Sequence, residues 1–231
     1  MIWFDFGGVL SPPLAELYDA YERKTGITRS QLQWAMRTVA DGMGVPTLAP
    51  VELALVTEAE WGRSLARALR DRHPAVDLSR ARLETFGEQW FAGVRANPAM
   101  MSALSCARDH GLRVGILTNN VPEWEPYWKD IVAPAGEIEC VIDSCKVGLR
   151  KPDPAIFELA ARTAGADPAS CVLVDDLAVN CDAARAQGWS AVHFTDDEQT
   201  LNDLARLTGL AALRGVPATT MPMAPSSARC A

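Results

Sequence analysis

The sequence predicts an α/β protein with a Rossmann-like parallel sheet, and two observations lead to this fold class. Short apolar segments alternate with amphipathic helical patterns after residue 98, an order typical of parallel sheets. Most of these segments are continuously apolar, as in strands that helices cover on both faces. Residues 14–97 instead contain several helical patterns in succession. We therefore expect an α/β core of residues 1–13 and 98–214 with an inserted α-helical region at 14–97.

The expected strands and helices follow in order along the chain. The first strand is Ile2–Phe4, and the others are residues 113–117, 139–142, 171–174 and 191–194. Three amphipathic patterns lie between them, and each stops at or near a glycine, which is a common end of a helix. These patterns predict helices at residues 99–110, 153–163 and 179–187.

Local signals support helices in the insertion and a flexible end to the chain. Thr28 with Gln31, and Thr57 with Glu60, have the spacing of capping boxes, which begin helices. Residues 215–231 are rich in Pro, Ala, Ser and Thr and have no periodicity. We expect this segment to be a flexible tail.

Composition and charge exclude some classes of function. The chain has 231 residues, of which 48% are hydrophobic, enough for a sizeable core. Its net charge of −7 argues against a nucleic acid or an anionic membrane as partner, because both favour a basic face. No apolar run is long enough to span a membrane, and Met1 leads directly into the first strand, so we expect a cytoplasmic protein. We expect a small-molecule partner and a monomer or homodimer.

Neither the cysteines nor the histidines form a recognisable ligand pattern. The six cysteines contain no CxxC pair and no zinc-site spacing with histidine, so we expect them to be small buried hydrophobic residues. The three histidines lie outside every motif and are expected at the surface: His73, His110 and His193.

Polar residues follow the first two expected strands. Asp5 ends the first strand and is followed by Gly7 and Gly8, which permit a sharp turn and leave backbone amides free to face a ligand. The second strand ends in Thr118 and Asn119. Because ligands bind at the carboxyl ends of the strands in parallel α/β sheets, these residues are candidates for a binding site.

A cation and an acidic pair complete this set. The fourth strand ends in Asp175 and Asp176, with Asn180 on the same face of the following helix. Lys151 precedes Pro152, whose fixed φ suits a first helical turn, so we expect Lys151 near a helix N-terminus. A nucleophile, hydroxyl and amide donors, a cation and an acidic cluster around one small volume are what phosphoryl transfer requires.

Four motifs resemble those of the haloacid dehalogenase (HAD) superfamily. DFGGVL is similar to the first family motif, LTNN to the second, the lysine of RKPDP to the third and VDDLAVN to the fourth. The resemblance extends from Met1 to about Leu207. Residues 143–160 and 172–184 are similar to the branch that includes the N-terminal phosphatase domain of mammalian soluble epoxide hydrolases. The helical insertion lies where that branch carries its cap. The resemblance therefore implies a HAD fold with an inserted α-helical cap.

The resemblance also implies roles for the motif residues. Asp5 would be the nucleophile and would form an aspartyl-phosphate. Asp5, the backbone carbonyl of Gly7 and Asp176 would hold Mg²⁺, with Asp175 as a weaker or water-mediated ligand. Asn180 would orient the acidic loop.

The other motif residues would contact the phosphoryl group. Thr118, the backbone of Asn119 and Lys151 would bind its oxygens, together with the backbone of Gly7 and Gly8. Mg²⁺ and Lys151 would supply the positive charge that lets a carboxylate approach a phosphate dianion.

The chain departs from the family pattern at Gly7, where phosphatases of the superfamily usually have a second aspartate as general acid and base. Three interpretations remain open. The first is a phosphatase with altered proton transfer, which is slow, uses a good leaving group or takes an acid such as Glu16 or Asp19 from the cap. The second is another HAD chemistry, either dehalogenation or a non-phosphatase reaction on a phosphate or diphosphate substrate. The third is a non-catalytic binding protein.

An aromatic segment at residues 121–128 follows the second motif. Trp124, Tyr127 and Trp128 in this segment are expected either to line a pocket for an apolar substrate or to pack the loop against the cap.

Overall fold

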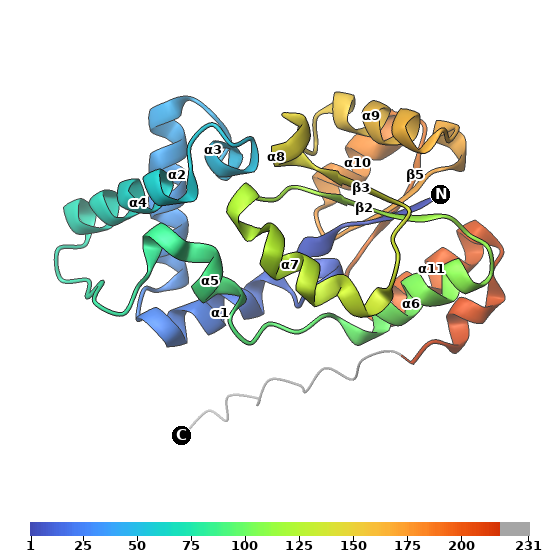
Figure 1. The fold of residues 1–231 in the computed structure, drawn as a ribbon, viewed down its shortest axis with the longest axis horizontal. Helices are drawn as coiled ribbons and strands as arrows, with labels where there is room; N and C mark the ends of the chain where they lie inside the picture. Colours follow the sequence, from blue (N-terminus) through green and yellow to red (C-terminus); the bar gives the residue numbers. More distant parts are fainter. Residues whose placement is uncertain (218–231) are drawn as a thin grey trace, which may run out of the picture.

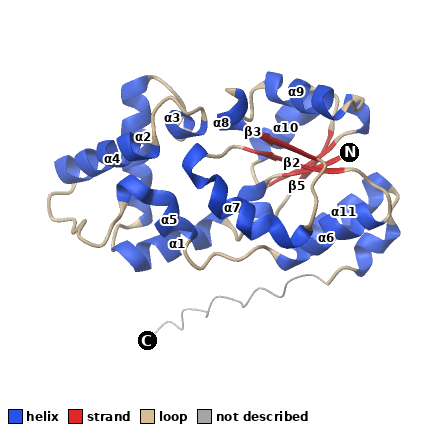
Figure 2. Ribbon diagram, viewed as in Figure 1, coloured by secondary structure: helices blue, strands red, loops and turns tan. Residues whose placement is uncertain are grey.

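The computed structural model describes residues 1–217 and contains one parallel five-stranded sheet in the order β3-β2-β1-β4-β5 (Figures 1 and 2). The strands are β1 Ile2–Phe4, β2 Val114–Thr118, β3 Cys140–Asp143, β4 Val172–Asp175 and β5 Ser190–His193. Each of the four neighbouring pairs is parallel. The predicted Rossmann-like α/β fold is confirmed.

Three of the strands extend one residue further toward the carboxyl edge than the sequence predicted. Thr118 pairs with Asp143, and Asp175 pairs with His193, so polar residues occupy the last positions of these ladders. Ladder pairing uses backbone groups, which are the same for polar and apolar residues. These three strands therefore have the predicted lengths but begin and end one residue later than the apolar pattern indicated.

Helices cover both faces of the sheet (Figure 2). Because side chains alternate along a strand, Phe4 packs in one hydrophobic cluster and Trp3 in the other. The first cluster includes side chains of α6 (Pro98–Asp109) and α11 (Asp197–Thr208). The second includes side chains of α9 (Pro154–Ala164) and α10 (Ala178–Ala186).

The segment between β1 and α6 is helical and lies beside the sheet rather than over either face (Figure 1). Thr28 and Thr57 form the predicted capping boxes with Gln31 and Glu60, and Gly26 ends a helix with φ +80°. The five helices of this segment are α1 Leu14–Thr25, α2 Arg29–Met43, α3 Ala49–Glu52, α4 Glu58–Arg72 and α5 Phe86–Phe91.

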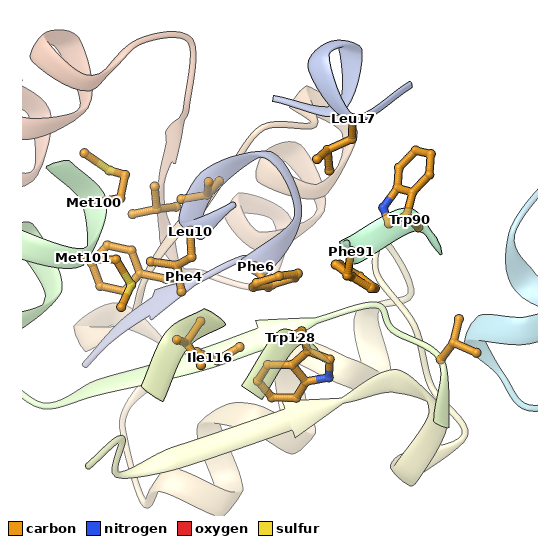
Figure 3. Packing of buried hydrophobic residues seen from close by; sticks show 14 of the residues in the cluster. Phe4, Phe6, Leu10, Leu17, Trp90, Phe91, Met100, Met101, Ile116 and Trp128 are labelled. Carbon is orange, nitrogen blue, oxygen red and sulfur yellow. The ribbon is translucent and has the colours of Figure 1, made fainter. Parts of the chain in front are cut away.

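An aromatic contact joins these helices to the sheet (Figure 3). The ring of Phe6, just after β1, lies 6.1 Å from that of Phe91 in α5 and 5.9 Å from that of Trp128 in α7 (Glu125–Val132). All three side chains are at least nine-tenths buried. The first hydrophobic cluster is therefore continuous from the insertion to the sheet.

Several details differ from the sequence prediction. Residues 125–132 form α7, although the aromatic segment was not predicted as a helix, and α8 (Ser144–Val147) and α11 were also not predicted. The helix after Lys151 begins at Pro154, with Asp153 as its N-cap, so Pro154 rather than Pro152 occupies the first helical turn. Of the predicted tail, Gly215 ends a short 3₁₀ helix, and residues 218–231 lie outside the described residues.

The cysteines and membrane-length segments can be assessed for residues 1–217. Cys171 and Cys181 are buried as expected, whereas Cys106, Cys140 and Cys145 are partly exposed; all five are free thiols, and Cys230 lies outside this range. Among the described helices, none combines the length and apolar character needed to cross a bilayer.

Candidate active site

Two acidic residues and one lysine meet at the carboxyl ends of β1 and β4. These strands are neighbours at the point where the strand order reverses, the usual ligand site of such sheets. Asp5 follows β1 directly and Asp175 is the last residue of β4. The Lys151 ammonium lies 3.0 Å from Asp5 Oδ1 and 2.6 Å from Asp175 Oδ2. The three side chains thus form one buried ionic network.

Lys151 is held by its backbone as well as by its charge. Its N–H donates to Asn119 Oδ1 at 2.8 Å, and its carbonyl accepts from Asn119 Nδ2 at 2.9 Å. The side chain is 1% exposed. Burial alone would lower the pKa of Lys151, but the carboxylates of Asp175 and Asp5 outweigh it and raise the pKa. Lys151 therefore remains a fixed cation.

Asp175 has both carboxylate oxygens engaged. Oδ2 contacts Lys151, and Oδ1 accepts from the Leu177 N–H and from Asn180 Nδ2, both at 2.9 Å. These bonds tie the end of β4 to the first turn of α10. Asn180 thus contacts the acidic loop through Asp175.

Three carboxylates converge at this site. One oxygen each from Asp5, Asp175 and Asp176 lies within 4.8 Å of the others. Burial raises the pKa of Asp5 to about 7, with Asp175 and Asp176 adding to the rise against the effect of Lys151. Burial and then Asp175 raise the pKa of Asp176 to about 6. One lysine does not balance three acids, so the cluster can hold a cation that prefers oxygen ligands.

The two glycines after Asp5 have different constraints. Gly8 has φ +74°, and a Cβ there would lie 2.4 Å from Asp176 Oδ2, so the close approach of this loop to Asp176 requires glycine. Gly7 has φ −67° and ψ 122°, and a Cβ there would meet nothing within 4 Å. Position 7 therefore accepts a side chain without backbone strain.

A cavity of about 190 Å³ adjoins these residues. Asp5, Gly7, Asn119, Lys151 and Asp176 line it, together with Asn180 and with side chains of the helical insertion. Thr118, Gly8 and Asp175 do not line it; the Thr118 side chain is 1% exposed at the end of β2. The structure thus brings five of the predicted site residues to one cavity and buries Thr118 beside them.

The acids suggested from the insertion do not reach this cavity. Glu16 and Asp19 are exposed on α1, and neither lines it. The insertion instead supplies Glu52, whose Oε2 accepts from Arg150 Nη2 at 2.6 Å and from Arg150 Nε at 2.8 Å. Burial raises the pKa of Glu52, although Arg150 opposes the rise.

Sequence reasoning missed both members of this ion pair. Glu52 lies in an apolar stretch, VELALV, where a single acid was an unexplained feature that could have drawn attention to it. Arg150 was marked only by its position next to Lys151.

The aromatic segment is divided between the cavity and the packing of neighbouring side chains. Trp124 lines the cavity, and its Nε1 donates to Glu58 Oε1 of α4 at 2.6 Å. Tyr127 stacks on Phe91 and Trp128 is buried against Phe6, so these two pack the segment against its neighbours.

Two histidines, His193 and His73, are partly buried and so differ from the expectation of a surface position. His193 is partly buried at the end of β5, and its Nε2 lies 3.0 Å from the backbone oxygen of Asp176. The ladder pairing of His193 with Asp175 brings it there, a contact that its position in the sequence did not indicate. His73 is also partly buried and lies edge-on to Trp34, whereas His110 is exposed.

Comparison with known families gives a consistent result. A family model of haloacid dehalogenase-like hydrolases matches residues 1–188. Bifunctional epoxide hydrolase 2 of Sus scrofa is 27% identical over 91% of this chain, and acyl-CoA dehydrogenase family member 10 of Mus musculus is 26% identical over 94%. The chain spans only 39% of the length of the epoxide hydrolase and 20% of the length of the acyl-CoA dehydrogenase family member. Phosphatase MT3486 of Mycobacterium tuberculosis is 30% identical over 58% of the chain and 63% of its own length.

Solved structures share the fold. A HAD family enzyme of Bacteroides thetaiotaomicron, in complex with magnesium and inorganic phosphate, has a TM-score of 0.55 and 18% identity over 83% of this chain and 91% of its own. An L-2-haloacid dehalogenase of Xanthobacter autotrophicus with covalently bound chloropropionic acid has a TM-score of 0.60 and 16% identity. The match covers 93% of this chain and 85% of the dehalogenase. At these identities the likeness concerns the fold alone.

We expect Gly8→Ala to destabilise the protein and Gly7→Ala, its matched control, to be tolerated. A left-handed conformation costs a non-glycine residue about 1–2 kcal/mol, and the new Cβ would also displace Asp176. At position 7 the change should be neutral or stabilise by up to about 1 kcal/mol, because it removes freedom from the unfolded chain. Urea denaturation of both variants measures the difference, and equal effects would contradict the assignment of Gly8 as the constrained position.

Proposed function

This chain belongs to the haloacid dehalogenase-like hydrolases, and from that premise we propose that it is a Mg²⁺-dependent phosphatase of small phosphate monoesters. The observation that carries the proposal is the cluster of Asp5, Asp175 and Asp176, of which Asp5 and Asp175 are buried against Lys151. A nucleophile, a cation and a set of oxygen ligands lie together at one cavity. The names of two relatives are consistent with this proposal: a phosphatase of Mycobacterium tuberculosis and a putative phosphatase of Bacillus subtilis.

The residues present fit a magnesium ion. Mg²⁺ prefers oxygen ligands, and three carboxylates offer oxygens within 4.8 Å of one another. Asp5, the backbone carbonyl of Gly7 and Asp176 would hold the ion. Asp175 would contact it weakly or through water, because both of its oxygens already accept hydrogen bonds. When bound, Mg²⁺ supplies positive charge that stabilises the transferring phosphoryl group.

The chain's own groups account for the first step. A carboxylate oxygen of Asp5 attacks phosphorus, and the bond from phosphorus to the ester oxygen breaks, with the electron pair leaving on that oxygen. Lys151 neutralises the phosphoryl charge from a position fixed by Asp175 and Asn119. The Thr118 hydroxyl and the Asn119 backbone are proposed as further donors to the phosphoryl oxygens.

The second step returns the enzyme to its starting state. Water attacks phosphorus of the aspartyl-phosphate, the bond from Asp5 to phosphorus breaks, and inorganic phosphate leaves. We propose that residues 14–97 act as a cap that limits access of bulk water to this chemistry. Their side chains line the cavity beside Asp5.

Because residue 7 is glycine, the first step lacks the aspartate that would protonate the leaving oxygen. A general acid is typically worth ~10²–10⁴-fold in rate. The Gly7 position is open, and the insertion acid that lines the cavity, Glu52, is ion-paired to Arg150. The favoured substrate is therefore an ester whose alcohol leaves without protonation.

Dehalogenation is the second candidate, because an L-2-haloacid dehalogenase shares the fold. In that reaction Asp5 would attack carbon and displace halide, a step that has no use for three clustered acids. Halide release from 2-chloropropionate, measured beside phosphate release, separates the two activities. A protein with neither activity would be the non-catalytic binding protein of the third interpretation.

Mg²⁺ should stabilise the protein more at about pH 8 than at about pH 5. At the lower pH the carboxyl groups of Asp5 and Asp176, whose pKa values are raised, carry protons that the metal has to displace. In the metal-free protein, protonated Asp5 favours the folded state below its ordinary pKa, and this contribution is lost as the pH rises through about 7. Calorimetric Tm values with and without Mg²⁺ give the shift at each pH. An equal shift at both pH values would contradict the metal site, and Asp176→Asn should reduce the shift at the higher pH.

Asp5→Asn should abolish turnover and leave the fold intact, because an amide is a poor nucleophile. We expect kcat for 4-nitrophenyl phosphate to fall at least about a thousandfold, as for other essential nucleophiles. The control Asp182→Asn changes an exposed pair with Arg185 and should leave kcat within about twofold. A variant that keeps most of its rate, or a wild type fully active in excess chelator, would refute the proposed chemistry.

Gly7→Asp should flatten the dependence of kcat/KM on leaving-group acidity. The wild type should strongly prefer activated aryl phosphates, and the new carboxylic acid should speed alkyl phosphates by about 10²-fold or more. Backbone conformation and space both permit the substitution. Gly7→Asn has the same shape without the acid and is the matched control. A shallow dependence in the wild type would show that another residue already donates the proton.

A further inference from the structure

The helical insertion gives the cavity beside Asp5 a predominantly apolar wall. Its contribution includes six large apolar side chains: Leu17, Met36, Leu48, Phe86, Trp90 and Phe91. The cavity volume of about 190 Å³ is a little above the ~150 Å³ of an engineered apolar cavity that binds benzene. A ligand that fills this space is small, and most of the insertion surface it meets is hydrocarbon.

The polar side-chain groups on this wall are few: the Tyr18 hydroxyl, the Glu52 carboxylate and the Trp90 indole N–H. Of the insertion side chains that line the cavity, those of Tyr18 and Glu52 carry oxygen. The Glu52 carboxylate is bound by two nitrogens of the Arg150 guanidinium. The Tyr18 hydroxyl lies 3.8 Å from the Met36 sulfur, which is a weak acceptor. A substrate with several hydroxyl groups would leave most of them without partners here, which costs binding free energy.

Trp124 adds a fixed aromatic surface from the core. Its Nε1 and the backbone N–H of Gly87 both donate to Glu58 Oε1 at 2.6 Å. Its ring stacks on Phe86 at an interplanar angle of 22°, and a Cβ at Gly87 would lie 2.3 Å from Trp124 Cδ1. Because the indole N–H is committed to Glu58, Trp124 presents apolar surface to the cavity at a single orientation.

From these observations we infer that the organic group of the substrate is a small apolar phenol, with Trp124 as a specificity-determining residue. This inference rests on the proposed phosphatase function and adds the class of leaving group. Two independent features favour it. The wall is aromatic and short of free hydrogen-bonding groups, and the open position at Gly7 provides no acid. A small apolar phenol suits both features. Its ring meets the apolar wall, and it departs as phenolate when the phosphorus–oxygen bond breaks and needs no proton to do so.

Binding of two non-hydrolysable ligands tests the inference separately from turnover. The probes are 3-ethylphenylphosphonate and 3-(hydroxymethyl)phenylphosphonate, which have nearly the same shape and differ by a terminal methyl or hydroxyl group. Calorimetric Kd values in the presence of Mg²⁺ should favour the ethyl compound by about tenfold or more, because its counterpart buries an unpaired hydroxyl. Equal affinities, a preference for the hydroxymethyl compound, or no binding of either would overturn the inference.

Two tryptophan variants connect the preference to Trp124. Trp124→Ala should reduce the ratio of the two Kd values toward one. Trp34→Ala is the matched control, because Trp34 lies in the insertion against His73 and does not line the cavity, and it should leave the ratio unchanged. A general loss of folded protein lowers the number of binding sites and leaves this ratio alone. An unchanged ratio in Trp124→Ala would overturn the assignment of Trp124.

Phosphate release from the corresponding aryl phosphate esters distinguishes the two proposals. Release with the same ethyl preference supports both. Selective phosphonate binding without phosphate release would refute the phosphatase and leave the apolar recognition in place. Release without selectivity would refute the inference alone.

Discussion

The architecture of the site depends on one buried cation. The Lys151 ammonium, 1% exposed, lies between the carboxylates of Asp5 and Asp175 and thereby joins the ends of two central strands to the loop before α9. A buried charge without partners is strongly unfavourable, so these groups constrain one another. Removing Asp175 would take away the nearer of the two carboxylates that contact the lysine, and removing the lysine would leave acids repelling each other. The same network that organises this edge of the sheet also collects the groups proposed for catalysis.

The helical insertion meets this edge through contacts between residues far apart in the chain. The Ser144 hydroxyl donates to the Glu52 carbonyl at 2.6 Å and accepts from the Asn120 N–H at 3.0 Å, so one side chain joins α3 to the loop after β2. The Glu52–Arg150 pair lies next to it. These polar contacts accompany the continuous hydrophobic cluster. Together they determine how close the insertion lies to Lys151, and therefore the size of the cavity.

The sequence predicted the core of the site because parallel strands share one carboxyl edge. Asp5 and Asp175 could be placed together from strand positions alone, whereas Glu52 and Arg150 could not, since their pairing depends on how the insertion packs. The individual roles of Gly7 and Gly8 were also beyond sequence reasoning. A glycine pair shows that the backbone turns, but only the φ angles and the space beside each Cα distinguish the residue that needs glycine from its neighbour. Three observed strands end one residue beyond their predicted ends, because ladder pairing continues into polar positions.

The ordinary backbone conformation of Gly7 has an evolutionary consequence. A position with negative φ and open space imposes no structural selection for glycine, so its residue type is free to change with the chemistry required. Glycine codons ending in a pyrimidine become aspartate codons by one base change. A proton donor can thus be gained or lost in one mutational step, without passing through a misfolded intermediate. The neighbouring position has no such freedom, because Gly8 lies against Asp176.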